Sequence, residues 1–319
     1  MSTGAQSKIG LGPEAVFGTP VPPTFGIAAK SSIKPTRDTL RYDGAGTGNA
    51  TQVGDPGRVR SSGGLSDTPA SPAMIGNLLR AFCGTRDTFL AGTPNTHTFK
   101  PRLQGLTATQ ARPSYTAHVE RNATKIDRFA GGQCDKLTFE CATDGRLIVS
   151  SDWIFKNFAV AATATPALDT SAPFRFKHAV HGIAAAPAVT APFGFFKNIK
   201  LEMMNSIISN ECQDGTDDVN AFFLGSVMIK VSGTICFNDG TLALAWRNNT
   251  VQNVKISYVQ SALLGIDFNI PQLRLDEADD YQIGNAGLLE QPFSGTAEFD
   301  AGIANMVSIV LRNAAADYA

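Results

Sequence analysis

The sequence predicts a mainly β protein with two tandem sandwich-like or barrel-like domains, each flanked by one short helix. Two observations lead to this class. Apolar and polar residues alternate along several runs, and a period of two is typical of strands that bury one face. In addition, a short pattern in the first half returns in the second half at a spacing of about 170 residues, as expected for a duplicated unit.

The clearest strand signal covers residues 136–155. Apolar residues alternate with polar ones on both sides of Asp144-Gly145, a dipeptide that favours the two-residue turn of a hairpin because it tolerates positive φ. Further strand-like runs lie at residues 195–203, 226–237 and 306–312. The sequence therefore predicts a long hairpin with one apolar face, followed by more strands of the same kind.

The internal repeat depends on two short matches. Ser62-Gly63 is similar to Ser232-Gly233, and Ile33 is matched by Ile199 within similar lysine-flanked segments. The two spacings, 170 and 166 residues, are nearly equal. A duplicated domain explains this agreement, and chance similarity is the alternative because each match is short.

The strongest helix signal lies at residues 71–84. Ser71 suits the N-cap, Pro72 suits the first helical position, and Gly84 suits the C-terminal stop. Apolar residues recur at helical spacing and predict one buried face, formed by Ile75, Leu78, Leu79 and Phe82. In the second half, Thr241–Arg247 is the corresponding short helix after the repeated Ser-Gly.

Composition suggests where the domains begin and end. Residues 1–30 are rich in Gly and Pro and predict an extended N-terminal arm. Residues 159–193 are rich in Ala, Pro and Thr with few charges, which predicts a linker or a long loop. The two β domains would then occupy residues 31–158 and 194–319.

Charge and hydropathy exclude several classes of protein. Lys and Arg number 27 against 28 Asp and Glu, a formal net charge of -1. That balance lacks the excess of positive charge with which DNA- and RNA-binding proteins attract phosphates. No run approaches the roughly 18 apolar residues of a membrane-spanning helix, and residues 1–10 lack the apolar core of a secretion signal.

Residue types that carry chemistry are scarce. The five cysteines are an odd number without a C-x-x-C pair, which predicts reduced, mostly buried thiols: Cys83, Cys134, Cys141, Cys212 and Cys236. Only four histidines are present, which leaves little material for metal binding or proton transfer: His97, His118, His178 and His181. Neither His178 nor His181 has a nearby Glu or Cys to complete a metal site.

The remaining motifs are weak. Gly44–Gly48 resembles a phosphate loop, but no helix start follows it. The acidic clusters at residues 214–218 and 276–280 lack the ligand spacing of an EF-hand loop, and solvated loops explain them better. No G-x-S-x-G elbow is present. We therefore predict no catalytic, cofactor-binding or metal-binding residues, and no enzyme.

Four segments together resemble a known family. Residues 10–20, Gly-Leu-Gly-Pro-Glu-Ala-Val-Phe-Gly-Thr-Pro, resemble an opening G-x-G-x-E-x-x-aromatic-G-T, and residues 128–140 resemble the start of a central hairpin. Residues 231–239 and 288–300 resemble the C-terminal half. The family is that of the tail tube (major tail) proteins of long, non-contractile-tailed bacteriophages, the siphoviruses. Phe17 stands where the family more often has Tyr.

The resemblance implies a structural protein of the virion tail, assembled in the host cytoplasm. It implies stacked rings around a lumen through which DNA passes without tight binding, and neither catalysis nor a cofactor. Its partners would be further copies of itself, a tape measure protein in the lumen, and the tail terminator and distal tail or baseplate proteins. Relatives with one tube domain form six-subunit rings, so two domains per chain predict a homotrimeric, pseudo-hexameric ring.

Two other classes are compatible with a neutral, mainly β chain. One is another virion structural protein, either a tail terminator or a capsid decoration protein. The other is a carbohydrate-binding β-sandwich module, which would need a row of exposed aromatic residues. Trp153 and Trp246 are the only tryptophans and there are five tyrosines, so the sequence favours the tail tube.

Overall fold

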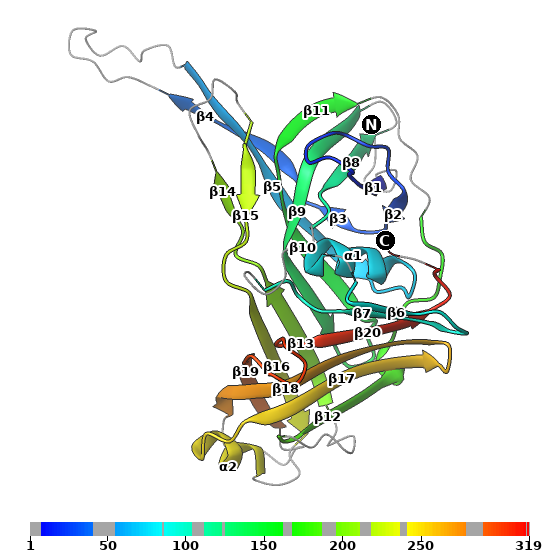
Figure 1. Ribbon diagram of the computed structural model, residues 1–319, viewed down its shortest axis with the longest axis vertical. Coiled ribbons are helices and arrows are strands. Elements are labelled where there is room, and N and C mark those ends of the chain that lie inside the picture. The colour runs from blue at the N-terminus through cyan, green and yellow to red at the C-terminus, as the bar shows by residue number, and fades with distance from the viewer. Residues whose placement is uncertain are drawn as a thin grey trace, which may run out of the picture.

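Antiparallel strands dominate the computed structural model of the chain (Figure 1). The structure describes residues 8–40, 55–84, 86–103, 112–122, 125–161, 168–186, 196–210, 218–236, 241–278, 290–316 and 318. The mainly β class predicted from the alternating runs is confirmed, together with two short helices. Within the described residues, neither helix is long and apolar enough to cross a membrane.

The elements follow one another in two series. The first half contains β1 (Lys8–Pro13), β2 (Phe25–Ile27), β3 (Lys30–Ser31), β4 (Lys34–Leu40), β5 (Asp55–Pro69), α1 (Met74–Cys83), β6 (Thr88–Leu90), β7 (Asn95–Phe99), β8 (Tyr115–Asn122), β9 (Lys125–Cys141), β10 (Ile148–Phe155) and β11 (Asn157–Ala161). The second contains a 3-10 turn (Phe176–His178), β12 (Ala179–Ala185), β13 (Phe196–Met204), β14 (Ile208–Asn210), β15 (Ala221–Phe223), β16 (Met228–Cys236), α2 (Thr241–Arg247), β17 (Gln252–Ser261), β18 (Leu264–Ala278), β19 (Glu290–Ala297) and β20 (Ser308–Asn313).

Strand β9 organises the first half, because four strands pair with it. Its first part pairs with β8 and β11, and its second part pairs with β10 and with β13 of the second half. Strand β5 pairs with β10, and β4 pairs with β5. Strand β1 pairs with β8, and β2 pairs with β1.

Strand β18 has the corresponding place in the second half. Its first part pairs with β17 and β20, and its last part pairs with β19. Strand β16 pairs with β19, β13 pairs with β16, and β12 pairs with β17. The order of pairing in the two halves is therefore the same, with β1, β4, β5, β8, β9, β10 and β11 corresponding to β12, β13, β16, β17, β18, β19 and β20.

The glycines matched in the sequence occupy corresponding positions in this pairing. Gly63 of β5 and Gly233 of β16 each lie opposite an aromatic residue of the next strand, Trp153 and Phe293 respectively. On the other side, a Cβ on Gly63 would come within 2.5 Å of Ile33 Cα, and Gly233 is the partner of Ile199. Both glycines thus permit close approach of the neighbouring strand.

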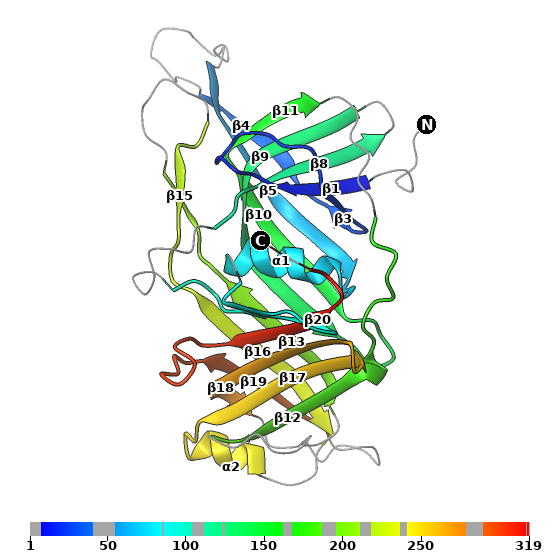
Figure 2. The same cartoon turned by 45° about the vertical axis from the view of Figure 1, so that its right-hand side comes forward.

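Among the described residues, two strand pairings join the halves. One is β9 with β13, and the other is β7 with β20, in which Phe99 lies opposite Ile309. Figure 2 shows β20 crossing between the strands of the upper and lower parts, below α1. A further contact between the halves is the packing of Phe139 of β9 on Phe268 of β18, with ring centroids 4.8 Å apart. The two halves therefore share one hydrophobic core.

The expectation of an extended arm over residues 1–30 is wrong for the described part. Ile9 and Leu11 of β1 and Ile27 of β2 are buried, and β1 pairs with β8 along its whole length. The prolines that suggested an arm lie mainly in the loop between β1 and β2. An average composition over 30 residues therefore does not reveal two short apolar strands. Residues 1–7 lie outside the described residues.

Residues 159–193 also contribute more than a linker. Strand β11 begins at Asn157 and ends inside this segment, Phe174 is fully buried, and β12 pairs with β17. In β12, Ile183 supplies the buried apolar side chain. Residues 162–167 and 187–195 of this segment lie outside the described residues.

The local predictions are mostly confirmed, with shifted ends. The hairpin at residues 136–155 forms as β9 and β10, but its turn centres on Thr143 and Asp144, with the Gly145 N–H donating to the Ala142 carbonyl at 3.0 Å. Helix α1 ends at Cys83, with Gly84 at the C-cap as expected, but it begins at Met74. Its cap is the carboxylate of Asp169, which accepts the Met74 N–H at 3.2 Å and the Ser71 hydroxyl.

His181 of β12 is a buried titratable group in the second half. Its ring packs edge-on against Phe196 and Tyr258, and its Nδ1 accepts the Ser257 N–H at 3.3 Å. Burial lowers the pKa of His181 to about 4. The folded chain therefore holds this imidazole neutral, with the ring proton on Nε2.

We expect this histidine to make the chain less stable in acid. Because the folded pKa is depressed, its stabilisation is complete above pH 6.5 and is lost as pH falls from 6.5 to 4, by about 3 kcal/mol in the free energy of unfolding. Urea unfolding across this pH range measures the effect. His181→Asn should flatten the profile, whereas His178→Asn, at a less buried position on the 3-10 turn, should leave most of it. Equal pH slopes in the parent and His181→Asn would contradict the assignment.

Candidate functional site: a charge-paired sheet face

Strands β10, β9, β13, β16 and β19 lie side by side and bury one face. Leu137, Leu201 and Val231 are among the buried side chains of that face. The opposite side chains are mostly polar, although Ile148, Met204, Met228 and Pro292 share that side of the sheet. We call the following twelve residues the polar face: Ser150, Asp152, Lys136, Thr138, Glu140, Lys200, Glu202, Lys230, Ser232, Thr234, Ser294 and Thr296. Their positions follow from the two-residue period of each strand and from the register between strands.

Glu202 is the centre of the charges on the polar face. Its carboxylate lies 2.9 Å from Lys136 Nζ and 3.1 Å from Lys200 Nζ. The hydrogen bond from Lys136 lowers the pKa of the Glu202 carboxyl, and Lys200 lowers it further. Lys200 also lies directly opposite Glu140, and Lys230 lies opposite Glu202. Each lysine of the polar face therefore lies close to a carboxylate, which belongs to a neighbouring strand or to the same strand.

The polar face is balanced as a whole. Its three lysines face three carboxylates, those of Asp152, Glu140 and Glu202. Most of the residues between the charged ones are serines and threonines, which are neutral and polar. Such a surface offers a passing anion no net attraction, because the field of each ammonium is cancelled within a few ångströms.

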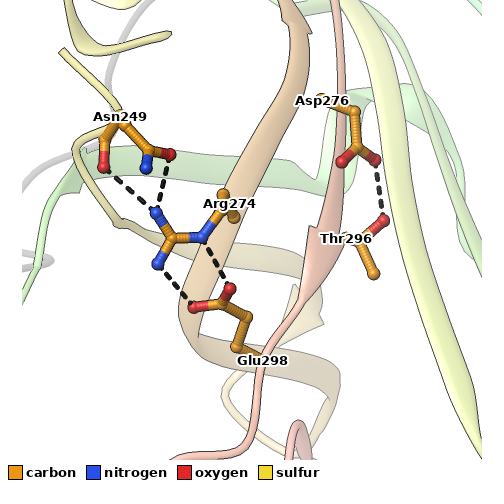
Figure 3. Close-up of polar contacts among 5 residues, drawn as sticks. All are labelled: Asn249, Arg274, Asp276, Thr296 and Glu298. Atoms are coloured by element: carbon orange, nitrogen blue, oxygen red, sulfur yellow. Dashed lines mark hydrogen bonds and ion pairs between the residues drawn. The ribbon is translucent and has the colours of Figure 1, made fainter.

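The same pairing continues at the junction of β18 and β19 (Figure 3). Arg274 forms a two-pronged contact with Glu298, with N···O distances of 2.6 and 3.0 Å, and also donates to Asn249 Oδ1 at 2.6 Å. This contact lowers the pKa of Glu298 and raises that of Arg274. Beside it, the Thr296 hydroxyl donates to Asp276 at 2.7 Å.

A second polar cluster lies in the first half, around the buried carboxylate of Glu14. Its Oε1 accepts the Thr116 hydroxyl at 2.6 Å and the Gly131 N–H at 2.8 Å. Its Oε2 accepts the Ser114 hydroxyl at 2.6 Å and the Gly18 N–H at 2.9 Å. Four donors from three segments therefore surround one side chain, which fixes the loop after β1 to β8 and β9.

Two of these donors depend on glycine. Gly18 and Gly131 have φ of 76° and 68°, a region that other residues avoid. A Cβ on Gly131 would also lie 2.5 Å from the Lys156 side chain. Between Gly18 and Glu14, Phe17 packs edge-on against Phe222 of β15, with ring centroids 5.8 Å apart. The segment Glu14–Gly18 thus links the first half to the β14–β15 pair of the second.

The residues considered for chemistry in the sequence are dispersed. Among the described residues, no three His, Cys, Asp or Glu side chains gather closely enough to hold a metal ion. Cys83, Cys134 and Cys141 are buried and Cys236 is half-buried, all as free thiols. Burial raises the pKa of Cys83 to about 12, so its reactive thiolate is disfavoured.

Several segments singled out in the sequence cannot be compared with the structure. Gly44–Gly48, Cys212, residues 214–217 and residues 279–280 lie outside the described residues. Of the second acidic cluster, Asp276 accepts the Thr296 hydroxyl and therefore has a structural contact. His178 and His181 lie on the 3-10 turn and β12, and each has its own hydrogen bond, with the N–H groups of Arg175 and Ser257.

A family model of phage tail tube proteins matches residues 4–297, which is most of the chain. The chain belongs to the phage tail tube protein family. This tail tube protein is therefore a structural component of the virion tail, and the match favours that function over the tail-terminator, capsid-decoration and carbohydrate-binding alternatives. No curated protein matches the chain.

The geometry explains the opening motif of this tail tube protein. Within G-x-G-x-E-x-x-aromatic-G-T, Glu14 binds four donors, Phe17 contacts the second half, and Gly18 supplies a positive φ. Gly12 permits close approach, because a Cβ there would lie 2.3 Å from the Pro22 carbonyl. The motif is thus a structural clasp. The sequence signalled these residues, but it missed the ion pairs of the polar face because they join different strands.

We expect Glu14→Gln to lower the free energy of unfolding of the tail tube protein by about 2–3 kcal/mol. The amide nitrogen that replaces one carboxylate oxygen cannot accept hydrogen bonds, so at least one buried donor loses its partner. Urea unfolding of the unassembled chain measures this. The control is Glu298→Gln, which breaks a partly exposed ion pair and should cost about 1 kcal/mol or less. Similar losses in the two variants would contradict the role assigned to Glu14.

Proposed function

We propose that this protein polymerises into stacked rings that form a hollow tail tube, through which the genome passes to the host. The polar face is the observation that carries the proposal. A continuous, charge-balanced sheet surface is suited to lining a lumen, because it stays hydrated without attracting the cargo. Duplex DNA has about one negative charge per 1.7 Å and would be held by a basic lining.

We further propose that the two halves are duplicated tube domains. Their identical order of strand pairing and the corresponding positions of Gly63 and Gly233 support this. The first domain would extend from β1 to β11 and the second from β12 to β20. These limits differ from residues 31–158 and 194–319, because β1, β2 and β12 pair within the domains rather than outside them.

Three chains would then form one ring. The strands β4, β5, β10, β9, β13, β16, β19 and β18 are consecutive neighbours within the chain. Three copies of this series exceed the 16–18 strands of porin barrels, which already enclose a water-filled channel. Joining two domains in one chain also lowers the entropy cost of closing the ring, since fewer bodies must meet.

The tube would function within a siphovirus-type tail assembled in the host cytoplasm. Its partners would be further copies of the chain, a tape measure protein in the lumen before ejection, and the tail terminator and distal tail or baseplate proteins at the two ends. DNA would be a passing cargo. A net charge of -1 supports this role, as does the balance of the polar face.

Electron cryo-microscopy of the polymerised protein tests the ring. We expect hollow tubes whose rings contain three chains, with true three-fold symmetry and six similar lobes. The polar face should line the lumen. Rings of six chains, each supplying one lobe, would contradict the duplicated domain, and the absence of tubes would contradict the proposed function itself.

We expect Glu202→Gln to make assembled tubes bind duplex DNA more tightly, by about tenfold or more at low salt. The substitution leaves Lys136 and Lys200 without their shared carboxylate, so each copy gains net positive charge on the polar face and releases counterions from DNA. Binding titrations across salt concentrations measure this. Glu120→Gln changes the net charge equally but lies on β8, away from the polar face, and should leave binding weak. Equal effects of both variants would show that the polar face does not meet DNA.

A further inference from the structure

A pocket of about 430 Å³ lies beside the clasp around Glu14. Its wall is formed by side chains of α1, of the segment before β8, of β9, of the loop after β1 and of β15. Two of these side chains are arginines, Arg80 of α1 and Arg112 of the segment before β8. The pocket therefore gathers two cations at a place separate from the polar face.

Arg112 is a buried cation with unused hydrogen-bond donors. Its Nη2 donates to the carbonyls of Phe82 and Cys134, each at 2.8 Å. Its Nε and Nη1 are also buried, and neither has a hydrogen-bond partner among the described residues. Burial lowers the pKa of the Arg112 guanidinium, because a charge held away from water is destabilised. A buried donor without an acceptor costs free energy, which an acceptor bound in the pocket would restore.

Arg80 adds a second cation without a partner. Its Nε is buried and unbonded within the part of the chain that the structure describes, and neither Arg80 nor Arg112 forms an ion pair there. Asp135 acts on Arg112 only from a greater distance, and its carboxylate accepts the Ile207 N–H at 2.7 Å. Arg102 adds a like charge near Arg112. The positive charge at this pocket is therefore only partly compensated.

The charge of the lining indicates what kind of ligand fits. Glu14 is the one carboxylate among the described lining residues, and its two oxygens already accept four hydrogen bonds. Two guanidinium groups and one carboxylate give the wall one net positive charge. A singly charged anion neutralises this wall, whereas a dianion such as phosphate would leave excess negative charge beside Glu14.

The remainder of the lining is largely apolar. Phe17 and Phe222, which pack edge-on against each other, are its largest members, and the Gln133 amide adds one more polar group. Apolar walls with a few convergent polar groups are typical of ligand pockets. The planar guanidinium group also matches the shape of a carboxylate. These features together favour a carboxylate that is attached to an apolar group.

We propose that this pocket binds a carboxylate attached to an apolar body, with Arg80 and Arg112 holding the carboxylate and Phe17 and Phe222 lying against the apolar body. The site belongs to a single chain and does not depend on the proposed tube. Two sources supply such a group, a free organic acid and an acidic side chain of a second copy of this chain. In both cases the carboxylate oxygens accept hydrogen bonds from the unused N–H groups.

Calorimetric titration of the unassembled chain with benzoate tests the site. Benzoate has one negative charge on an aromatic ring, and we expect saturable binding with a Kd of about 1 mM or below. Benzamide has nearly the same shape without the charge. It should bind about tenfold more weakly or worse, because a hydrogen bond to a charged acceptor is stronger than one to a neutral acceptor.

Arg80→Gln and Arg112→Gln should each weaken benzoate binding by about tenfold or more. Arg112→Gln also removes the donor to the Phe82 and Cys134 carbonyls and so affects folding. Arg80→Gln breaks no side-chain hydrogen bond of the described residues, which makes it the decisive variant. The matched control is Arg247→Gln, which removes an exposed arginine at the end of α2 and should bind benzoate as the parent chain does.

The same titration on assembled tubes distinguishes the two sources. If an acidic side chain of a second copy fills the pocket, tubes bind no benzoate, and excess benzoate, but not benzamide, slows polymerisation. If the natural ligand is a free acid, tubes bind benzoate as tightly as the unassembled chain. Both results support the site. No saturable binding to the unassembled chain, or equal affinities in the parent chain and Arg80→Gln, overturns it while leaving the proposed tube untouched.

Discussion

The fold depends on strand β9 and on its change of partners part-way along. Its first part belongs with β8 and β11, whereas its second part lies between β10 and β13. One strand therefore passes from the sheet of the first half into the sheet that joins both halves. Where β9 changes partners, Gly131 has a positive φ that permits the strand to bend. Its N–H donates to the Glu14 carboxylate.

The clasp around Glu14 follows from that bend. A strand that turns out of one sheet leaves backbone donors without ladder partners, and a buried donor without a partner is costly. Glu14 receives one such donor from β9 and three more from the neighbouring segments. The carboxylate is stable in the interior because charged acceptors bound by several donors offset their own desolvation.

In the five strands β10, β9, β13, β16 and β19, the same two-residue alternation forms both the core and the polar face. Alternate residues fill the shared core, where Phe139 meets Phe268. The others form the polar face, where Glu202 pairs with Lys136 and Lys200. Stability and surface charge are thus set by different residues of the same strands, so the lining proposed for the lumen can change in charge without disturbing the core.

By itself, the sequence determined the features that depend on short stretches of chain. The two-residue period showed the strands at 136–155, the Gly84 stop showed the end of α1, and the repeated Ser-Gly showed corresponding positions in the two halves.

Only the tertiary structure decided which strands lie side by side. Lys136 and Glu202 are far apart in the sequence, and so are Asp169 and the helix it caps. Alternation specifies the face of a residue but not its cross-strand neighbour, because register is set by long-range pairing across the whole sheet. For the same reason, composition alone misjudged β1 and β12, whose burial depends on β8 and β17 rather than on their own few apolar residues.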